Sequence, residues 1–490
     1  MNWLSIYPEI VLLTMACVVT LLDLFVTDPA HKPTYVVTQL TLAVVAAMHF
    51  ADFNAGLTVY GMDRMVVSDP LGHLLGFFAC LAVMAVLVYS RAYAAQREIL
   101  NGEFFSLTLF SLLGILVMLS ANNFLVIYLG LELMSLSLYA LVALRRDHPQ
   151  STEAAMKFFV LGALASGFLL YGLSMMYGAT GSLDIPEVFK VIATGQVNKT
   201  VLAFGLVFIV SGLAFKLSAV PFHMWVPDVY DGAPTAVTLL IGCAPEFAAF
   251  AITFRLLVEG LSGLAVDWQQ MLIVLSVGSM ALGNLAAIAQ RSIKRMLAYS
   301  AIAHMGFMLL GFTPTVVADN TYSAANGYSS ALFYVIVYVF TTLGAFATIM
   351  LLARRGFEAD RIEDFKGLSR RCPWCAGVMA LFMFSLAGVP PTVGFYAKLA
   401  VLQSIVTTNQ PGYIALAVVA VLLSLVGAFY YIRIVKVMYF DEPTDRSPIV
   451  AGGDVRALLS LNGAAILLFG ILPGGLMALC SQAILRALAS

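Results

Sequence analysis

Charged side chains are scarce in this sequence: only 11% of the 490 residues are Asp, Glu, Lys or Arg, while 61% are hydrophobic. A soluble protein carries about 25% charged residues, so this scarcity excludes a soluble globular protein. The formal net charge of −1 offers no basic surface for nucleic acid. We therefore expect an integral membrane protein that is built almost entirely of membrane-spanning segments and surrounded by membrane lipids.

Cysteines and long polar loops are also rare. Of six cysteines, Cys372 and Cys375 have the spacing of a redox motif, but they flank a basic loop with no second cysteine pair nearby. A structural role is therefore favoured over a redox or metal-binding role. The connections between apolar segments leave no room for a soluble domain that could hold a nucleotide, a flavin or an iron–sulfur cluster. No positively charged region precedes the first apolar run, which we expect to be a span and not a signal peptide.

Apolar segments recur along the whole chain. About twenty apolar residues cross a bilayer, and this length predicts roughly fourteen transmembrane helices in an all-α fold. The predicted spans are 8–27, 34–51, 71–90, 104–121, 123–144, 155–177, 200–224, 233–258, 269–290, 298–315, 329–353, 374–405, 411–439 and 457–485.

The basic residues predict the orientation of these spans. Of 26 lysines and arginines, Lys216, Arg255 and Lys398 fall within spans. All the others, Arg446 among them, fall on the side opposite the N-terminus, except for Arg64, Lys190, Lys199 and Arg486. Because basic residues collect on the cytoplasmic side of a membrane, we expect the N-terminus to lie outside.

Two spans combine a lysine with a proline. Lys216 precedes Pro221 by five residues, and Lys398 follows Pro390 and Pro391. A charged side chain at the centre of a membrane helix costs roughly 2.5–3.5 kcal/mol on insertion scales, so it is retained mainly where it has a function. A proline breaks the helix and leaves carbonyl groups free to bind an ion or water. We predict two discontinuous helices, each with its own lysine.

The two broken segments also predict an internal repeat. They are five spans apart, an odd number, so they cross the membrane in opposite directions, and their lysines fall on opposite sides of their prolines. Inverted repeats with broken helices are typical of secondary transporters. We predict one polytopic domain, 1–490, with five-helix inverted repeats at 104–258 and 269–439 and flanking helices at 1–103 and 440–490.

Further titratable side chains lie inside the predicted spans. Glu132 either pairs with Lys216, since intramembrane charges usually neutralise one another, or is held near an interface by local hydrogen bonds. Glu246 follows Pro245 and is either a proton-carrying group or a polar residue at a turn near the surface. His223 and His304 titrate near neutral pH and suit a proton relay, although a lone histidine is as often structural.

Four segments of the sequence resemble a known family. They are Lys216–Pro234, Asn284–Ser300, His304–Gly306 and Leu386–Pro390. Together they resemble the antiporter-like subunits of respiratory complex I, whose relatives are the large subunits of multisubunit cation/proton antiporters and of membrane-bound hydrogenases. The resemblance covers nearly the whole chain.

The resemblance implies a function in proton translocation, driven by NADH oxidation and quinone reduction in other subunits. The family's fifth-helix glutamate corresponds to Glu132, its seventh-helix lysine to Lys216 and the lysine that ends the pathway to Lys398. Lys294 lies in a basic motif with an implied role at the inner surface. One position departs from the family, because bacterial relatives usually have a lysine where this chain has Glu246, and a carboxylate there reverses the local charge.

The resemblance also implies the surroundings of the chain. NADH, FMN, iron–sulfur clusters and quinone are expected on other subunits, and no cofactor is expected in this chain. The implied partners are other membrane-arm subunits, including neighbouring antiporter-like ones, in a bacterial inner (plasma) membrane with the N-terminus in the periplasm. Two alternatives remain open: a subunit of a multisubunit sodium/proton antiporter, and a purely structural membrane anchor.

Overall fold

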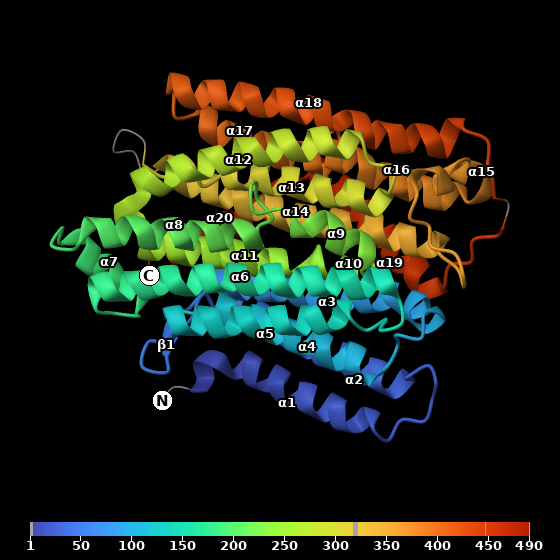
Figure 1. Cartoon of the computed structure of the whole chain (residues 1–490), viewed down its shortest axis with the longest axis horizontal. Coiled ribbons are helices and arrows are strands. Elements are labelled where there is room, and N and C mark those ends of the chain that lie inside the picture. The colour runs from blue at the N-terminus through green and yellow to red at the C-terminus, as the bar shows by residue number, and fades with distance from the viewer. Residues whose placement is uncertain (1–2, 317–321, 446, 490) are drawn as a thin grey trace.

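The structure is a computed structural model that describes residues 3–316, 322–445 and 447–489. Arg446, which the sequence places on the basic side, lies outside the described residues. Long helices run side by side across the molecule, and the two ends of the chain lie at the same end of the bundle (Figure 1). The predicted helical membrane fold is confirmed, with one addition: a short antiparallel hairpin of β1 (Val59–Gly61) and β2 (Val66–Ser68).

The first half of the chain forms the helices on one flank and the lower part of the core. Their bounds are α1 (Tyr7–Asp23), α2 (Lys32–Ala55), α3 (Pro70–Gln96), α4 (Gly102–Leu119), α5 (Phe124–Val142), α6 (Pro149–Thr180), α7 (Ile185–Ala193), α8 (Lys199–Lys216), α9 (Trp225–Gly232), α10 (Thr235–Ile241), α11 (Ala244–Thr253) and a π-helix (Phe254–Gly260).

The second half completes the core and forms the opposite flank. Its helices are α12 (Ala265–Ile288), α13 (Ile293–Leu310), α14 (Tyr322–Leu352), α15 (Leu368–Arg371), α16 (Pro373–Ala387), α17 (Val393–Val406), α18 (Pro411–Phe440), α19 (Gly453–Ile471) and α20 (Gly474–Ala489). Short 3-10 turns lie at Trp3–Ile6, Ser262–Leu264 and Ile362–Phe365.

The predicted spans all have helical counterparts. Eleven helical segments in the described part of the chain are long and apolar enough to cross a membrane. The remaining predicted spans correspond to α1, α13 and the broken pair α16 and α17. Short polar side chains at helix starts satisfy free backbone N–H groups: Asp69, Asn101, Asn123, Asn198 and Ser292 each accept a hydrogen bond from the first turn that follows.

Both predicted interruptions are confirmed. The helix α8 ends at Lys216, and irregular backbone continues to Trp225, where α9 begins. Similarly, α16 ends at Ala387 and α17 begins at Val393. Each break removes the backbone N–H groups of a continuing helix, so carbonyl groups at the end of the preceding helix accept side-chain hydrogen bonds instead: Phe215 from Trp225, and Leu386 and Ala387 from Lys398.

A third interruption was not predicted. It separates α10 from α11 at Gly242 and Cys243, just before Pro245 in the first turn of α11. The same pass then ends in the π-helix Phe254–Gly260. Segments of π-helix are frequent at functional sites. The pass that carries Glu246 is therefore irregular in two places.

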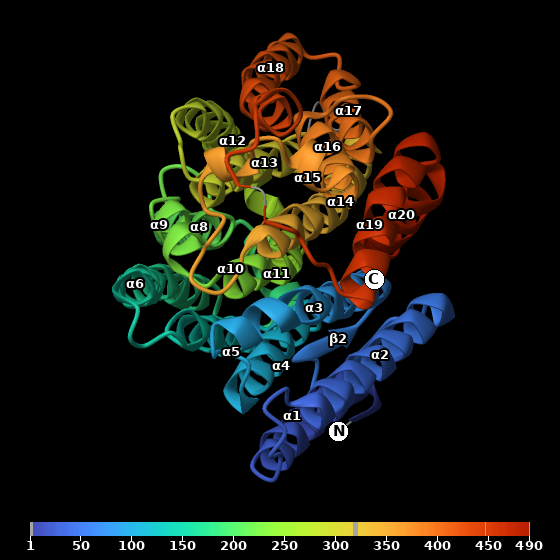
Figure 2. The ribbon, with the colours of Figure 1, turned by 90° about the vertical axis from the view of Figure 1, so that its right-hand side faces the viewer.

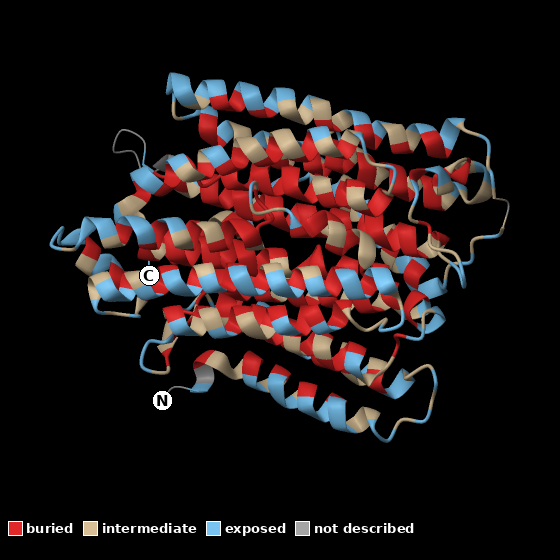
Figure 3. Ribbon diagram, in the orientation of Figure 1, coloured by how far each residue is buried: buried red, intermediate tan, exposed pale blue. Residues whose placement is uncertain are grey.

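This irregular pass lies at the centre of the bundle. Within its most apolar stretch, 94% of the residues of Thr235–Gly260 are buried, compared with 22% for Pro411–Phe440. The end-on view places α10, α11 and α14 between a flank made of α1 and α2 and an opposite flank made of α18 (Figure 2). Burial follows the same order, with exposed residues along the outer helices (Figure 3). The division into repeats 104–258 and 269–439 stays a prediction.

Candidate functional site: a row of titratable side chains in the bundle

Lys216 lies at the first break, as the last residue of α8. Its ammonium donates a hydrogen bond to Oγ of Ser135 on α5 at 2.8 Å, and it lies 5.8 Å from the centre of the Phe215 ring. Trp225, at the start of α9, donates from Nε1 to the carbonyl oxygen of Phe215 at 3.1 Å. A hydroxyl group and an aromatic ring thus surround a cation where the helix has ended.

Glu132 lies one turn before Ser135 on α5. Of the two alternatives for Glu132, pairing with Lys216 is not seen as a direct contact among the described residues: the ammonium bonds to Ser135, and Glu132 lies within electrostatic range of it. The Glu132 Oε1 atom is buried without a hydrogen-bond partner among the described residues. Ser135 lines the cavity at Lys216, whereas Glu132 does not. The serine therefore takes the contact that we had expected of the carboxylate.

Lys216 and Glu246 line the same cavity. It has a volume of about 30 Å³, and Ser135 also contributes to its wall. A cavity needs roughly 10–15 Å³, on this measure, to hold one water molecule. There is thus room for about two water molecules between a lysine on α8 and a glutamate on α11.

Glu246 is enclosed by the protein. Its side chain is 4% exposed, and its Oε2 atom has no hydrogen-bond partner within the part of the chain that is described. The alternative that Glu246 lies at a turn near the surface is therefore wrong, although the helix is interrupted just before Pro245. The break between α10 and α11 accounts for this position, because it places the carboxylate in the interior of the bundle.

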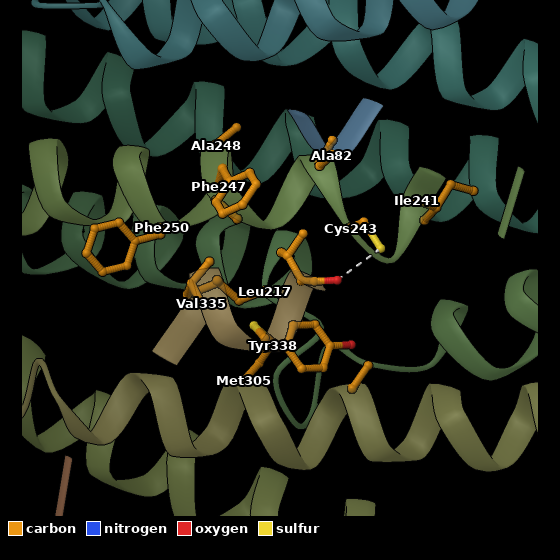
Figure 4. Close-up of a cluster of buried hydrophobic side chains, with 14 of the residues drawn as sticks. Ala82, Leu217, Ile241, Cys243, Phe247, Ala248, Phe250, Met305, Val335 and Tyr338 are labelled. Carbon is orange, nitrogen blue, oxygen red and sulfur yellow. Dashed lines mark hydrogen bonds between the residues drawn. The ribbon is translucent and has the colours of Figure 1, made fainter. Parts of the chain in front are cut away.

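Tyr338 on α14 connects this region with the next titratable group. Figure 4 shows its ring in the same buried cluster as Leu217, Met305 and Phe247, the last being the neighbour of Glu246 in the sequence. Tyr338 lies within electrostatic range of Glu246, and its ring centre is 5.2 Å from that of His304. Sequence analysis missed this tyrosine, because an aromatic residue within an apolar run carries no signal that separates it from the core.

The break beside Tyr338 is held by a contact between two passes. Cys243 directs its thiol toward the carbonyl oxygen of Val339 on α14 at 3.8 Å, as the dashed line in Figure 4 shows. Ile241 and Phe247 lie on either side of Cys243 in the same view. The pass that carries Glu246 is therefore fixed against α14, which carries Tyr338.

His304 occupies the centre of a cluster of hydroxyl groups. Its Nδ1 atom lies 2.6 Å from the hydroxyl oxygen of Tyr334, and its Nε2 atom lies 3.0 Å from that of Tyr431. Ser300 forms a further hydrogen bond with Tyr431. His304 and Tyr338 both line a cavity of about 10 Å³, which is close to the size of one water molecule. These groups can pass a proton from one to the next.

Lys398 lies beside the second break. Its ammonium donates to the carbonyl oxygens of Leu386 at 3.0 Å and Ala387 at 3.1 Å, and to Oγ of Ser424 at 2.9 Å. The two carbonyl groups are free because α16 ends there. The negative end of the helix dipole also favours a cation at this position. Lys398 lies within electrostatic range of His304.

Lys294 and His223 lie outside this row. Lys294 is buried near the basic end of the bundle, where it donates to the carbonyl oxygen of Ala233 at 3.2 Å and lies 3.5 Å from Asp360. His223 lies within the first break and is half-buried. Its Nδ1 atom has no hydrogen-bond partner in the described residues. Neither side chain lines the cavities at Glu246 and His304.

A charged cluster at the basic end anchors the central pass. Glu358 accepts from Arg97 Nε at 2.8 Å and from the hydroxyl of Tyr93 at 3.1 Å, and the backbone N–H of Thr235 donates to the same hydroxyl at 3.2 Å. Partial burial raises the pKa of Glu358, but the hydrogen bond and charge of Arg97 outweigh it and hold the pKa below its ordinary value. Cys372 and Cys375, at the start of α16, are joined by a disulfide.

Comparison with known proteins shows which family has this sequence and arrangement of helices. A family model described as "NADH:quinone oxidoreductase/Mrp antiporter, TM" matches residues 121–424. The NADH-quinone oxidoreductase subunit N of Herminiimonas arsenicoxydans is 63% identical and covers 100% of this chain and 99% of its own length. That of Polaromonas naphthalenivorans is 59% identical and covers 99% and 97%.

Solved structures agree with these relatives. A chain of respiratory complex I from Thermus thermophilus is 30% identical, with a TM-score of 0.81, and the match covers 97% of this chain and 99% of that one. A chain of the Mrp complex from Dietzia has a TM-score of 0.85 over 99% and 97% of the two chains, but at 20% identity it shows the fold alone.

A membrane bundle in which two interrupted helices each have a lysine beside the break is typical of an antiporter-like membrane subunit. The N-terminal segment Ile6–Ile10 and the number of predicted spans resemble one subunit type within that class. The chain belongs to the NADH-quinone oxidoreductase subunit N family.

Proposed function

We propose that this chain carries protons across the bacterial inner membrane as a subunit of an NADH-quinone oxidoreductase. The observation that supports the proposal most directly is the row of Lys216, Glu246, His304 and Lys398, together with the cavities that lie along it. The two relatives from Herminiimonas arsenicoxydans and Polaromonas naphthalenivorans are named as subunits of that enzyme. The chain thus contributes to a translocase, with NADH, FMN, iron–sulfur clusters and quinone on other subunits.

The proposed cycle begins between α5 and α8. A movement in a neighbouring membrane-arm subunit changes the distance between Glu132 and Lys216. The two side chains are free to change their distance because Lys216 is bonded directly to the uncharged Ser135 and not to Glu132. A lysine that loses the attraction of a carboxylate releases its proton more readily. Lys216 then delivers that proton to water in the shared cavity, and Glu246 accepts it.

The second half of the cycle leads to Lys398. The proton moves from Glu246 through the hydroxyl of Tyr338 and the His304 cluster to Lys398. In our proposal the N-terminus is periplasmic, because most basic residues lie at the opposite end, and Lys398 releases the proton to the periplasm. Lys294 acts at the inner surface of the membrane, and His223 acts as a relay group at the first break, between α8 and α9.

Replacement of Lys216 by alanine in the assembled complex tests this function. We expect NADH-driven proton pumping to fall while the complex remains assembled, because the variant removes the first proton donor and no backbone contact. Lys190→Ala is the matched control, since Lys190 is 61% exposed and forms an ion pair with Glu187 on the same short helix. An unchanged ratio of protons to electrons in Lys216→Ala would exclude the proposed role.

The alternative function is that of a sodium/proton antiporter subunit. The likeness to the Mrp complex gives this alternative the fold but no more, since the two chains are 20% identical. Sodium-dependent proton exchange in vesicles without NADH would favour it. A purely structural anchor would instead retain pumping when Lys216 and Lys398 are both replaced by alanine.

A further inference from the structure

A second chain of titratable groups lies outside the row that contains Lys216 and Lys398. It is formed by Tyr7 and Glu9 of α1, His49 and Asp52 of α2, and His73 of α3. These residues lie near the end of the bundle where the chain begins and where β1 is found (Figure 1). The cycle proposed above uses none of them.

Two histidines form the centre of this chain. The Nδ1 atoms of His49 and His73 are 3.0 Å apart. A hydrogen bond between two ring nitrogens needs one donor and one acceptor, so the contact holds one proton that can belong to either ring. On its other side, His73 Nε2 lies 2.8 Å from Oγ of Ser68 and 3.9 Å from Oδ2 of Asp52.

The outer end of this chain reaches the surface. The Asp52 side chain is 28% exposed, and its Oδ2 atom accepts a hydrogen bond from the hydroxyl of Tyr7 at 2.6 Å. The side chain of His73 is 7% exposed. The exposed fraction of the side chain thus falls from Asp52 to His73. A proton that arrives from water therefore reaches the Asp52 carboxylate before it reaches His73.

The inner end of this chain lies at a small polar cavity. Glu9 and His49 line a cavity of about 10 Å³ together with Ser5, Ser120 and Asp69, and this volume is close to that needed for one water molecule. Within the described residues, the Oε2 atom of Glu9 and the Nε2 atom of His49 are buried and have no hydrogen-bond partner. Because buried polar groups are normally satisfied, these two atoms need a partner that the cavity between the side chains has room to hold.

The fold leaves room for the His49 ring. The position beside it on α3 is Gly76, where a Cβ atom would lie 2.8 Å from Cε1 of His49. The ring could not keep this position against any larger residue without moving. The backbone of α3 therefore fits the imidazole that joins His73 to the cavity.

Fixed charges separate this second chain of titratable groups from Glu246. Arg255 of the π-helix bonds to Asp69 at 2.9 Å and lies 3.4 Å from Glu259, and its Nε donates to the carbonyl oxygen of Leu119 at 3.0 Å. An arginine stays protonated in proteins, so it cannot pass a proton on. It lies on the same pass as Glu246 and divides the two sets of titratable groups.

We propose that Asp52, His73, His49 and Glu9 form a second proton-transfer chain, with one water molecule between His49 and Glu9. A proton taken up at Asp52 binds Nε2 of His73, while the proton on Nδ1 of His73 moves to Nδ1 of His49. The proton on Nε2 of His49 then moves through the water to the Glu9 carboxylate. Glu9 is the buried binding site for a proton that arrives from the N-terminal side of the membrane, independently of Lys216.

Infrared difference spectroscopy on the intact complex tests the proposal. A pH step should reveal the carbonyl band of a protonated carboxyl group, and Glu9→Gln should abolish that band while the complex stays assembled. Glu153→Gln is the matched control, because Glu153 is 65% exposed on α6, and it should leave the band unchanged. A band that persists in Glu9→Gln would overturn the assignment of the site.

The exchange of this band in deuterated water tests the path. His49→Gln should slow the exchange by roughly tenfold or more, because it removes a proton-transfer group, and an unchanged exchange rate would overturn the path. Gly76→Ala offers a second variant that removes no titratable group, with Gly167→Ala as its control, since a Cβ at Gly167 meets nothing within 4 Å. Exchange should be slowed only in Gly76→Ala. This readout does not depend on pumping, so its failure would leave the role of Lys216 untouched.

Discussion

Lys216 and Glu246 line one cavity of about 30 Å³ from two different helices, α8 and α11. The lysine bonds to Ser135 at 2.8 Å, whereas the carboxylate has a buried oxygen without a partner in the described part of the chain. An ammonium group and a carboxylate that share room for water can exchange a proton without a movement of the backbone. This relationship is the reason why Glu246 is the first acceptor after Lys216 in the proposed cycle.

Replacing Glu246 by glutamine should therefore interrupt proton transfer. Glutamine has almost the same shape but cannot bind and release a proton, so we expect the pumping rate to fall by roughly tenfold or more, with assembly unchanged. Proton uptake driven by NADH in reconstituted vesicles measures the effect. The conservative Glu246→Asp should keep part of the activity, while normal pumping by Glu246→Gln would remove this residue from the path.

The family resemblance implies a lysine at this position in bacterial relatives, and exchange of Glu246 for lysine offers a second prediction. Glu246→Lys would place two ammonium groups in the same cavity, where like charges repel each other strongly because little water screens them. We expect one of the two lysines to lose its proton and pumping to remain above that of Glu246→Gln, since an amine can still carry a proton. Pumping as low as in the glutamine variant would show that a carboxylate is required here.

Tyr338 should also prove necessary for transfer beyond Glu246. Tyr338→Phe removes the hydroxyl that joins Glu246 to His304 in the proposed path, but it keeps the ring, whose centre lies 5.2 Å from that of the histidine. We expect slower pumping and an unchanged yield of assembled complex. Tyr89→Phe is the control, because the Tyr89 hydroxyl is also buried but lies in the wall of a different cavity. Equal pumping rates in the two variants would contradict the prediction.

The sequence could predict the charged members of the row. A lysine in an apolar segment raises the free energy of membrane insertion, and a proline nearby indicates a helix break. Lys216 and Lys398 could therefore be recognised from the sequence, together with the breaks beside them. Glu246 was also identified as a charged residue beside a proline, Pro245. The sequence left open whether it is a proton-carrying group inside the bundle or a polar residue at a turn near the surface.

The uncharged members of the row could not be predicted. Ser135, Tyr334 and Tyr338 lie in apolar helices where hydroxyl groups are common, and their importance comes from what they face across the bundle. The contact of Lys216 with Ser135 in place of Glu132 depends on the rotation of α5 about its axis, which the sequence does not reveal. The second proton-transfer chain, at His49 and His73, was also missed, because the sequence does not reveal which side chains of different helices face each other.

Gly388 should be required for the position of Lys398. Its φ of 84° lies in the left-handed region that favours glycine, and a Cβ atom there would lie 3.0 Å from Cδ of Lys398. Gly388→Ala should cost about 1–2 kcal/mol of stability and lower pumping, because the lysine must move from its carbonyl partners. Gly377→Ala on α16 is the matched control, since its Cβ would meet nothing within 4 Å. Similar thermal stability and pumping in both variants would contradict this account.

The contact between Arg97 and Glu358 predicts a pH-dependent contribution to stability. Burial opposes the charged form of Glu358, but Arg97 lowers its pKa in the folded protein below the value of an unfolded chain, which is about 4.3. The contribution is therefore complete above about pH 4.3, and it is lost as the pH falls through the lower folded pKa. Glu358→Gln should lower the thermal stability of the complex at neutral pH.

The difference between wild type and Glu358→Gln should shrink as the pH falls below about 4, because both then carry an uncharged side chain. Thermal unfolding of the solubilised complex, followed from pH 7 downward, measures it. Glu153→Gln is the control, since exposed ion pairs such as that of Glu153 with Lys157 contribute little at any pH. The start of α10 depends on Glu358 through the hydroxyl of Tyr93. A stability difference that stays constant with pH would show that packing, and not the charge of Glu358, holds the central pass at this end.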